Sequence, residues 1–194
     1  MLPEELRYPA VYFDGHACLY ERATKYSTSY FGGPTEIQLA GLRHGPRPIH
    51  HLMTLNWRAI PGIEKKGVTE LPLFYGMGYS GCSMTYEIVE SSRCKLLEME
   101  PSKSSADWPY SGYPDLLPYI PLRLAQRVSC SQEQFRELLC QRSEVKPDEV
   151  TVIVPAMFDL GISLWGHSGD AEGVQIVFHC DIEKGIVRAY NECT

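Results

Sequence analysis

Several features that mark large classes of proteins are missing from this 194-residue sequence. No apolar run approaches the roughly 18 residues that a membrane-spanning helix needs, and the first 19 residues lack the basic start and apolar core of a secretion signal. The 18 Lys and Arg residues form no basic stripe and are outnumbered by 24 Asp and Glu residues. Because phosphate binding needs clustered cations, we expect no nucleic-acid partner, no membrane association and a soluble, cytoplasmic protein.

Paired cysteines are also missing. The seven cysteines are an odd number with no C-x-x-C spacing, so the sequence predicts free thiols in a reducing compartment. The densest histidine cluster is His44, His50 and His51, but adjacent side chains on a strand point to opposite faces. We therefore expect no metal site and no other cofactor.

The residues that are present predict one domain, 1–194, built mainly from short strands. A hydrophobic content of 44% and a charged content of 22% are ordinary for a globular protein. The dipeptide Asp14-Gly15, between two runs of aromatic and β-branched residues, predicts a type I′ hairpin. In the longest apolar stretch, 71–89, Gly76, Gly78 and Gly81 predict a hairpin or a bulged corner.

One segment, 131–142, has the pattern of an amphipathic helix. Ser131 and Gln134 match a capping box, and Phe135, Leu138 and Leu139 share one face at helical spacing. Together with about nine or ten short strands, this predicts an α+β fold, mainly an antiparallel β sheet or sandwich with one clear amphipathic helix. There is no regular βαβ alternation and no Gly-rich phosphate fingerprint.

The sequence resembles the YwqG-like family of bacterial proteins, whose biochemical activity is unassigned. The resemblance rests on four blocks, 29–34 (SYFGGP), 52–61 (LMTLNWRAIP), 71–74 (LPLF) and 165–169 (WGHSG), followed by a closing apolar strand and Cys193. It implies a β-rich fold and supplies no catalytic residue.

The proline-rich segment 101–119 carries several aromatic residues and predicts a long ordered loop. Its Trp108, Tyr110 and Tyr113, with Tyr79 in the Gly-rich turn, are our candidate binding residues, because Trp and Tyr present large contact areas at low entropic cost. The alternative is that these rings only cover the sheet beneath them. We favour contact with a protein partner.

A catalytic interpretation stays open beside the binding one. It assigns a small hydrolase or transferase activity to Cys82, or to His167 with Asp170, because a thiolate needs a nearby base and a histidine needs an orienting carboxylate. The non-catalytic alternatives are that Cys82 is a buried thiol at the start of a strand and that 164–173 is an ordinary polar turn. Gly78-Tyr79-Ser80-Gly81-Cys82 does not match G-x-S-x-G, which excludes a nucleophile elbow.

The sequence therefore favours a binding or interaction protein of unassigned activity, and an immunity or antitoxin role is one concrete version. It leaves open whether the protein is an enzyme, which partner or substrate it takes, and its oligomeric state.

Overall fold

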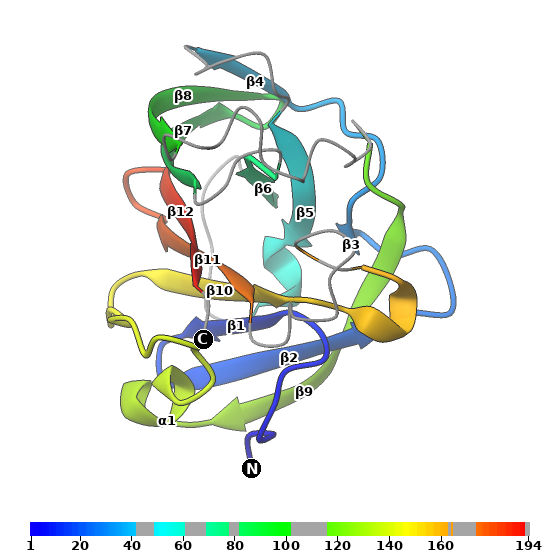
Figure 1. Cartoon of the computed structure of the whole chain (residues 1–194), viewed down its shortest axis with the longest axis vertical. Helices are drawn as coiled ribbons and strands as arrows, with labels where there is room; N and C mark the ends of the chain where they lie inside the picture. The colour runs from blue at the N-terminus through cyan, green and yellow to red at the C-terminus, as the bar shows by residue number, and fades with distance from the viewer. Residues whose placement is uncertain are drawn as a thin grey trace.

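The computed structural model describes residues 1–41, 49–60, 69–77, 82–101, 116–162, 164 and 174–192. Twelve strands form one sheet in the order β4-β8-β7-β12-β11-β10-β1-β2-β9-β3-β5-β6 (Figure 1). In chain order the strands are β1 (Ala10–Phe13), β2 (His16–Arg22), β3 (Ser29–Phe31), β4 (Gln38–Gly41), β5 (His50–Asn56), β6 (Glu70–Tyr75), β7 (Cys82–Glu90), β8 (Arg93–Pro101), β9 (Ile120–Ser129), β10 (Val150–Pro155), β11 (Gln175–Asp181) and β12 (Ile186–Glu192). One short α-helix, α1 (Gln132–Arg136), and the 3₁₀ turns η1 (Trp57–Ala59) and η3 (Phe158–Leu160) complete the described elements.

The predicted α+β class is wrong, because the fold is almost entirely β. Only the antiparallel part of that prediction is confirmed: β4 and β8 pair in parallel, and the other strand pairs of the sheet are antiparallel.

The middle strands are buried on both faces, and alternate side chains serve two cores. Val152 and Phe178 point into the larger core, while Ile153 and Val177 belong to a second core on the opposite face. Because side chains alternate along a strand, the two sets separate cleanly. The second core is closed by α1 and the residues after it, through Phe135 and others.

The hairpin predicted at Asp14-Gly15 is confirmed. Asp14 and Gly15 both have positive φ, 47° and 70°, as a type I′ turn requires, and β1 pairs with β2 up to Phe13 and His16. The loop before β12 closes a second hairpin, where Lys184 donates its backbone N–H to Asp181 over 3.0 Å. Both turns are held by residues close together in the chain.

The helix predicted over 131–142 is much shorter, although its capping box is present. Phe135, Leu138 and Leu139 are buried as expected. The helix stops because the Gln175 side chain, from β11, accepts the N–H of Cys140 over 3.0 Å and donates to the Leu138 carbonyl over 2.8 Å. These are backbone groups that a continuing helix would bond to itself. No helix in the described ranges is long and apolar enough to cross a membrane.

Of the hairpin or bulged corner expected within 71–89, the hairpin is wrong, and residues 78–81, where a corner would lie, are outside the described residues. β6 pairs with β5, and β7 pairs with β8 and β12, so these two strands share no ladder. Instead the sheet curls until β6 faces β7, and tyrosine hydroxyls join them. Tyr86 donates to the Pro72 carbonyl over 2.8 Å and accepts the Phe74 N–H over 3.1 Å.

Tyr75 makes the reciprocal contacts with the start of β7. Its hydroxyl donates to the Cys82 carbonyl over 2.8 Å and accepts the Cys82 N–H over 3.1 Å. Two phenols thus provide hydrogen-bond partners for buried backbone groups of both strands.

Candidate functional site: a tyrosine surface and a buried histidine network

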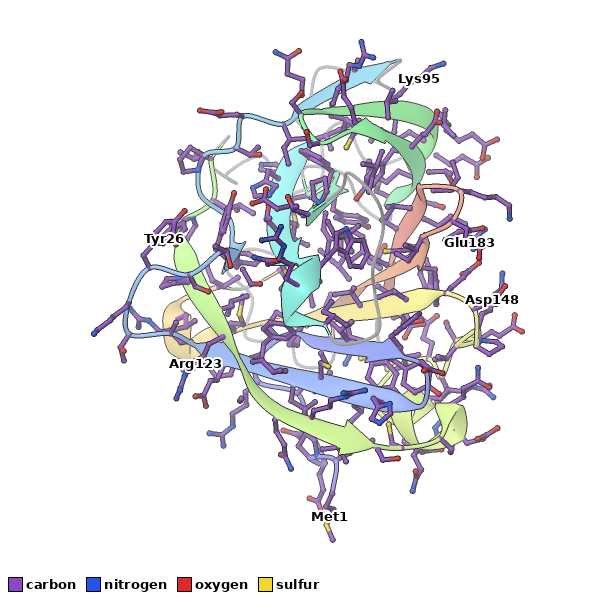
Figure 2. All side chains as sticks on the ribbon, turned by 180° about the vertical axis from the view of Figure 1, so that it is seen from behind. Met1, Tyr26, Lys95, Arg123, Asp148 and Glu183 are labelled. Carbon is purple, nitrogen blue, oxygen red and sulfur yellow. The ribbon has the colours of Figure 1, made fainter. Side chains whose placement is uncertain are left out.

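Three large apolar side chains are exposed near the start of β9. Tyr26 has 81% of its surface exposed, Leu116 56% and Tyr119 39%. The Tyr26 and Tyr119 rings stack with their centroids 6.1 Å apart and an angle of 14° between their planes. Figure 2 shows Tyr26 at the outer edge of the molecule. We call these three residues the tyrosine surface.

The Tyr119 ring is held firmly in this surface. Its hydroxyl donates to the Ser27 carbonyl over 3.2 Å, and its ring packs on Gly33. Gly33 has a φ of +72° and a Cβ there would come within 2.8 Å of the ring, so two independent reasons require glycine. The Gly33 N–H donates to the Leu117 carbonyl over 2.8 Å, which fixes the chain just before Tyr119.

A row of rings continues from the tyrosine surface into the larger core. Successive centroid distances are 5.2 Å for Tyr119 to Tyr30, 5.6 Å for Tyr30 to His51, 5.6 Å for His51 to Phe74 and 5.8 Å for Phe74 to Tyr86. Burial lowers the pKa of His51 to about 4, so this ring is neutral near pH 7. The exposed tyrosines therefore rest on a packed and uncharged support.

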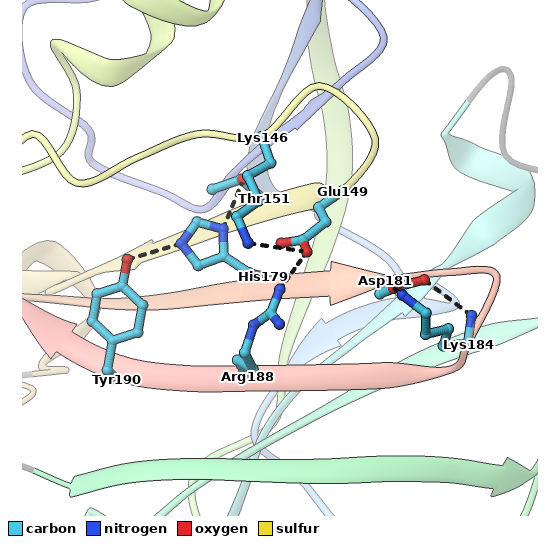
Figure 3. Close-up of polar contacts among 8 residues, drawn as sticks. All are labelled: Lys146, Glu149, Thr151, His179, Asp181, Lys184, Arg188 and Tyr190. Carbon is cyan, nitrogen blue, oxygen red and sulfur yellow. Dashed lines mark hydrogen bonds and ion pairs between the residues drawn. The ribbon is translucent and has the colours of Figure 1, made fainter.

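A second cluster lies on the face of β10, β11 and β12 that carries the second core, and it centres on His179 (Figure 3). The Nδ1 atom of His179 lies 3.1 Å from the Thr151 hydroxyl, and Nε2 lies 2.8 Å from the Tyr190 hydroxyl. Burial is the main cause that lowers the His179 pKa, and the Tyr190 ring stacks on the imidazole at 5.6 Å. Both ring nitrogens are occupied, so this histidine is positioned as a neutral structural group.

A fully buried carboxylate, Glu192, lies two residues after Tyr190 on the same strand. It accepts from the Ser143 hydroxyl, and it accepts the Gln141 N–H over 3.0 Å. These contacts tie the loop after α1 to β12. A satisfied network of this kind rigidifies the elements that it joins.

A charged group flanks the same face. The buried Glu149 carboxylate accepts from Arg188 and lies 3.6 Å from the Lys146 amine (Figure 3). The Glu149 contact is the largest cause that raises the Arg188 pKa. Because a buried carboxylate needs cationic partners, these two side chains hold the end of this loop against β12.

Cys82, the candidate nucleophile, opens β7 with 1% of its surface exposed. Burial raises the pKa of its thiol to about 12, which is the opposite of the activation that a nucleophilic thiolate needs. A catalytic role for Cys82 stays a prediction that its surroundings do not favour.

The other candidate residues lie outside the described residues. They are His167 and Asp170 for catalysis and Tyr79, Trp108, Tyr110 and Tyr113 for binding. Among the residues that the structure does describe, no group of three or more His, Cys, Asp or Glu side chains is placed to hold a metal ion.

Sequence reasoning missed the exposed Tyr26 and the His179 network. A usable signal was present, because Gln175 and His179 occupy alternate positions of one strand, as do Tyr190 and Glu192 of the next, which predicts one polar face. No comparable local pattern separates Tyr26 from an ordinary loop tyrosine.

Comparison with protein-family models, with curated proteins and with solved structures finds no match to this chain. The resemblance to the YwqG-like family stays a prediction.

Proposed function

We propose that this protein is a non-catalytic binding protein that contacts a protein partner through the tyrosine surface. The observation that carries the proposal is the exposed, stacked pair of Tyr26 and Tyr119 rings on a packed aromatic support, with Leu116 exposed three residues before Tyr119. Aromatic side chains supply much of the energy of protein interfaces, and a support that is already ordered costs little entropy on binding.

Composition supports the same proposal. The formal charge of −6 disfavours nucleic acid, and the buried, high-pKa Cys82 thiol gives no support to catalysis. The described cysteines are free, as expected for a reducing cytoplasm. An immunity or antitoxin role remains the most concrete version, in which the partner is an enzyme whose toxicity coexpression of this protein relieves.

The test is native cross-linking and copurification, followed by affinity measurement with the purified partner. We compare the wild-type protein with Tyr26→Ser, and Leu97→Ser serves as a matched control because Leu97 is an exposed apolar residue of β8. We expect Tyr26→Ser to weaken binding by roughly 30-fold, the scale of a 2 kcal/mol interface residue, and Leu97→Ser to leave it unchanged.

Two outcomes contradict the proposal. One is that no protein is recovered reproducibly with the wild-type chain. The other is that Tyr26→Ser and Leu97→Ser bind the recovered partner with the affinity of the wild type.

A further inference from the structure

A cavity of about 660 Å³ lies between the N-terminal segment and the loop after α1, and it shares no residue with the tyrosine surface. This volume is within the usual range for small-molecule sites. Its charged lining comes from three parts of the chain: Glu4, Glu5 and Arg7, then Glu137 and Arg142, then Asp159 of η3. Leu6, Leu138 and Val174 supply apolar wall.

The charges of this lining are unequal. Four carboxylates face two guanidinium groups, which leaves two negative charges without compensation. One guanidinium is already engaged, since Arg142 lies 2.8 Å from the Glu137 carboxylate. An anionic ligand would meet net repulsion here, whereas a cation would gain attraction.

Asp159 is the best-positioned of the carboxylates. The Tyr8 hydroxyl donates to its Oδ2 over 2.6 Å, which orients the group at the cavity wall. Within the described part of the chain, its Oδ1 has no hydrogen-bond partner. This leaves one carboxylate oxygen of Asp159 open to a ligand.

We propose that this cavity binds a small organic cation, with an ammonium or guanidinium group at Asp159 and an apolar chain against Leu6, Leu138 and Val174. The apolar wall favours an organic cation over a hydrated inorganic ion. A chelated divalent metal does not fit, because the described carboxylates do not converge as a group of three or more ligands.

The test is calorimetric titration of the full chain with 1,5-diaminopentane, which has two ammonium groups and a five-carbon chain. We expect saturable binding to one site with a Kd of the order of 1 mM, a typical strength for so small a ligand. The neutral 1,5-pentanediol should not bind, because it has the same chain without the charges.

Asp159→Asn should weaken diaminopentane binding by at least about 10-fold, the loss expected of one charge-assisted hydrogen bond. An asparagine oxygen can still accept from Tyr8, so the fold should persist, and the thermal unfolding midpoint checks this. Glu183→Gln is the matched control, because it removes one exposed negative charge from the turn between β11 and β12. It should leave the Kd unchanged.

The proposal is overturned if the protein shows no saturable heat with diaminopentane, or if the diol binds equally well. It is also overturned if Asp159→Asn and Glu183→Gln reduce binding alike, since that result would show only attraction to the acidic surface. Partner binding by the tyrosine surface is measured separately, so the failure of either proposal is distinguishable from failure of the other.

Discussion

Gly32 illustrates how single positions of this chain are constrained from two sides. Its φ is +59°, and a Cβ built there would clash with the Pro118 carbonyl oxygen and come within 2.9 Å of Leu117. Gly161 has a similar φ of +71° but an open surrounding, with no atom within 4 Å of the added Cβ. A side chain at Gly161 would meet backbone strain alone, whereas a side chain at Gly32 would meet both backbone strain and steric overlap.

We expect Gly161→Ala to lower the free energy of unfolding by about 1 kcal/mol, the cost of a left-handed conformation for alanine. Gly32→Ala should cost at least about 2 kcal/mol more, because the backbone of residues 117 and 118 must move as well. Urea unfolding of both variants measures the difference. Equal losses would show that the approach of the Pro118 carbonyl places no constraint on Gly32.

The chemical role of a single residue cannot be predicted from its type alone. The roles of Cys82 and His179 depend on what surrounds them, and most of those neighbours are distant in the chain. Cys82 is buried and its backbone bonds the Tyr75 hydroxyl of β6, and His179 bonds Thr151, which is 28 residues away. Residue type alone suggested chemistry for Cys82, which its burial does not favour.

Among the elements, β6 and β7 depend on side chains for a contact that strands usually make with their backbones. Tyr86→Phe removes the hydroxyl that serves both Pro72 and Phe74, and it leaves a buried carbonyl and a buried N–H unpaired. We expect a loss of about 1 to 3 kcal/mol in the free energy of unfolding.

Denaturant unfolding checks this expectation. Tyr26→Phe is the control, because its ring is exposed and no described group bonds its hydroxyl, and it should change stability by less than about 0.5 kcal/mol. If both tyrosine variants behave alike, the bridge between β6 and β7 does not stabilise the sheet.

Elements whose signals are local could be predicted, and those decided by distant groups could not. The Asp14-Gly15 turn and the capping box at Ser131 are specified within a few residues, and both form. The length of α1 was overestimated because Gln175, some 40 residues further along, takes the backbone groups of the next turn. The burial of Phe135 and Leu138 still followed the pattern, since both conformations turn these side chains inward.

At the scale of the whole molecule, buried histidines should make stability depend on pH. The pKa of His51 falls from 6.5 to about 4 on folding, so the unfolded chain binds its proton first as pH drops. The stabilising effect is complete above pH 6.5 and is lost progressively between about pH 6.5 and 4. His179 acts in the same direction, because burial lowers its pKa too.

Protonation of His51 should lower the free energy of unfolding by about 3 kcal/mol at most between pH 7 and pH 4. His51→Gln keeps a group able to bond Thr54 but removes the imidazole that titrates. The free energy of unfolding of this variant should therefore fall less between pH 7 and pH 4 than that of the wild type. Its loss of stability at pH 7 should be smaller than the acid destabilisation that it avoids at pH 4. Urea midpoints at three pH values measure the slope. An unchanged slope in the variant would contradict the assignment of the titration to His51.

The position of β1 in the middle of the sheet has a consequence for synthesis. β1 and β2 are joined by a local turn, yet β1 pairs with β10 at Ala10 and Ile153, about 140 residues apart. On a ribosome that adds about 5–20 residues per second, this partner emerges roughly 7 to 30 s later. The partner of β2 is β9, which is also made after the middle of the chain. The hairpin that can form first must therefore keep both of its edges unpaired while more than half of the protein is translated.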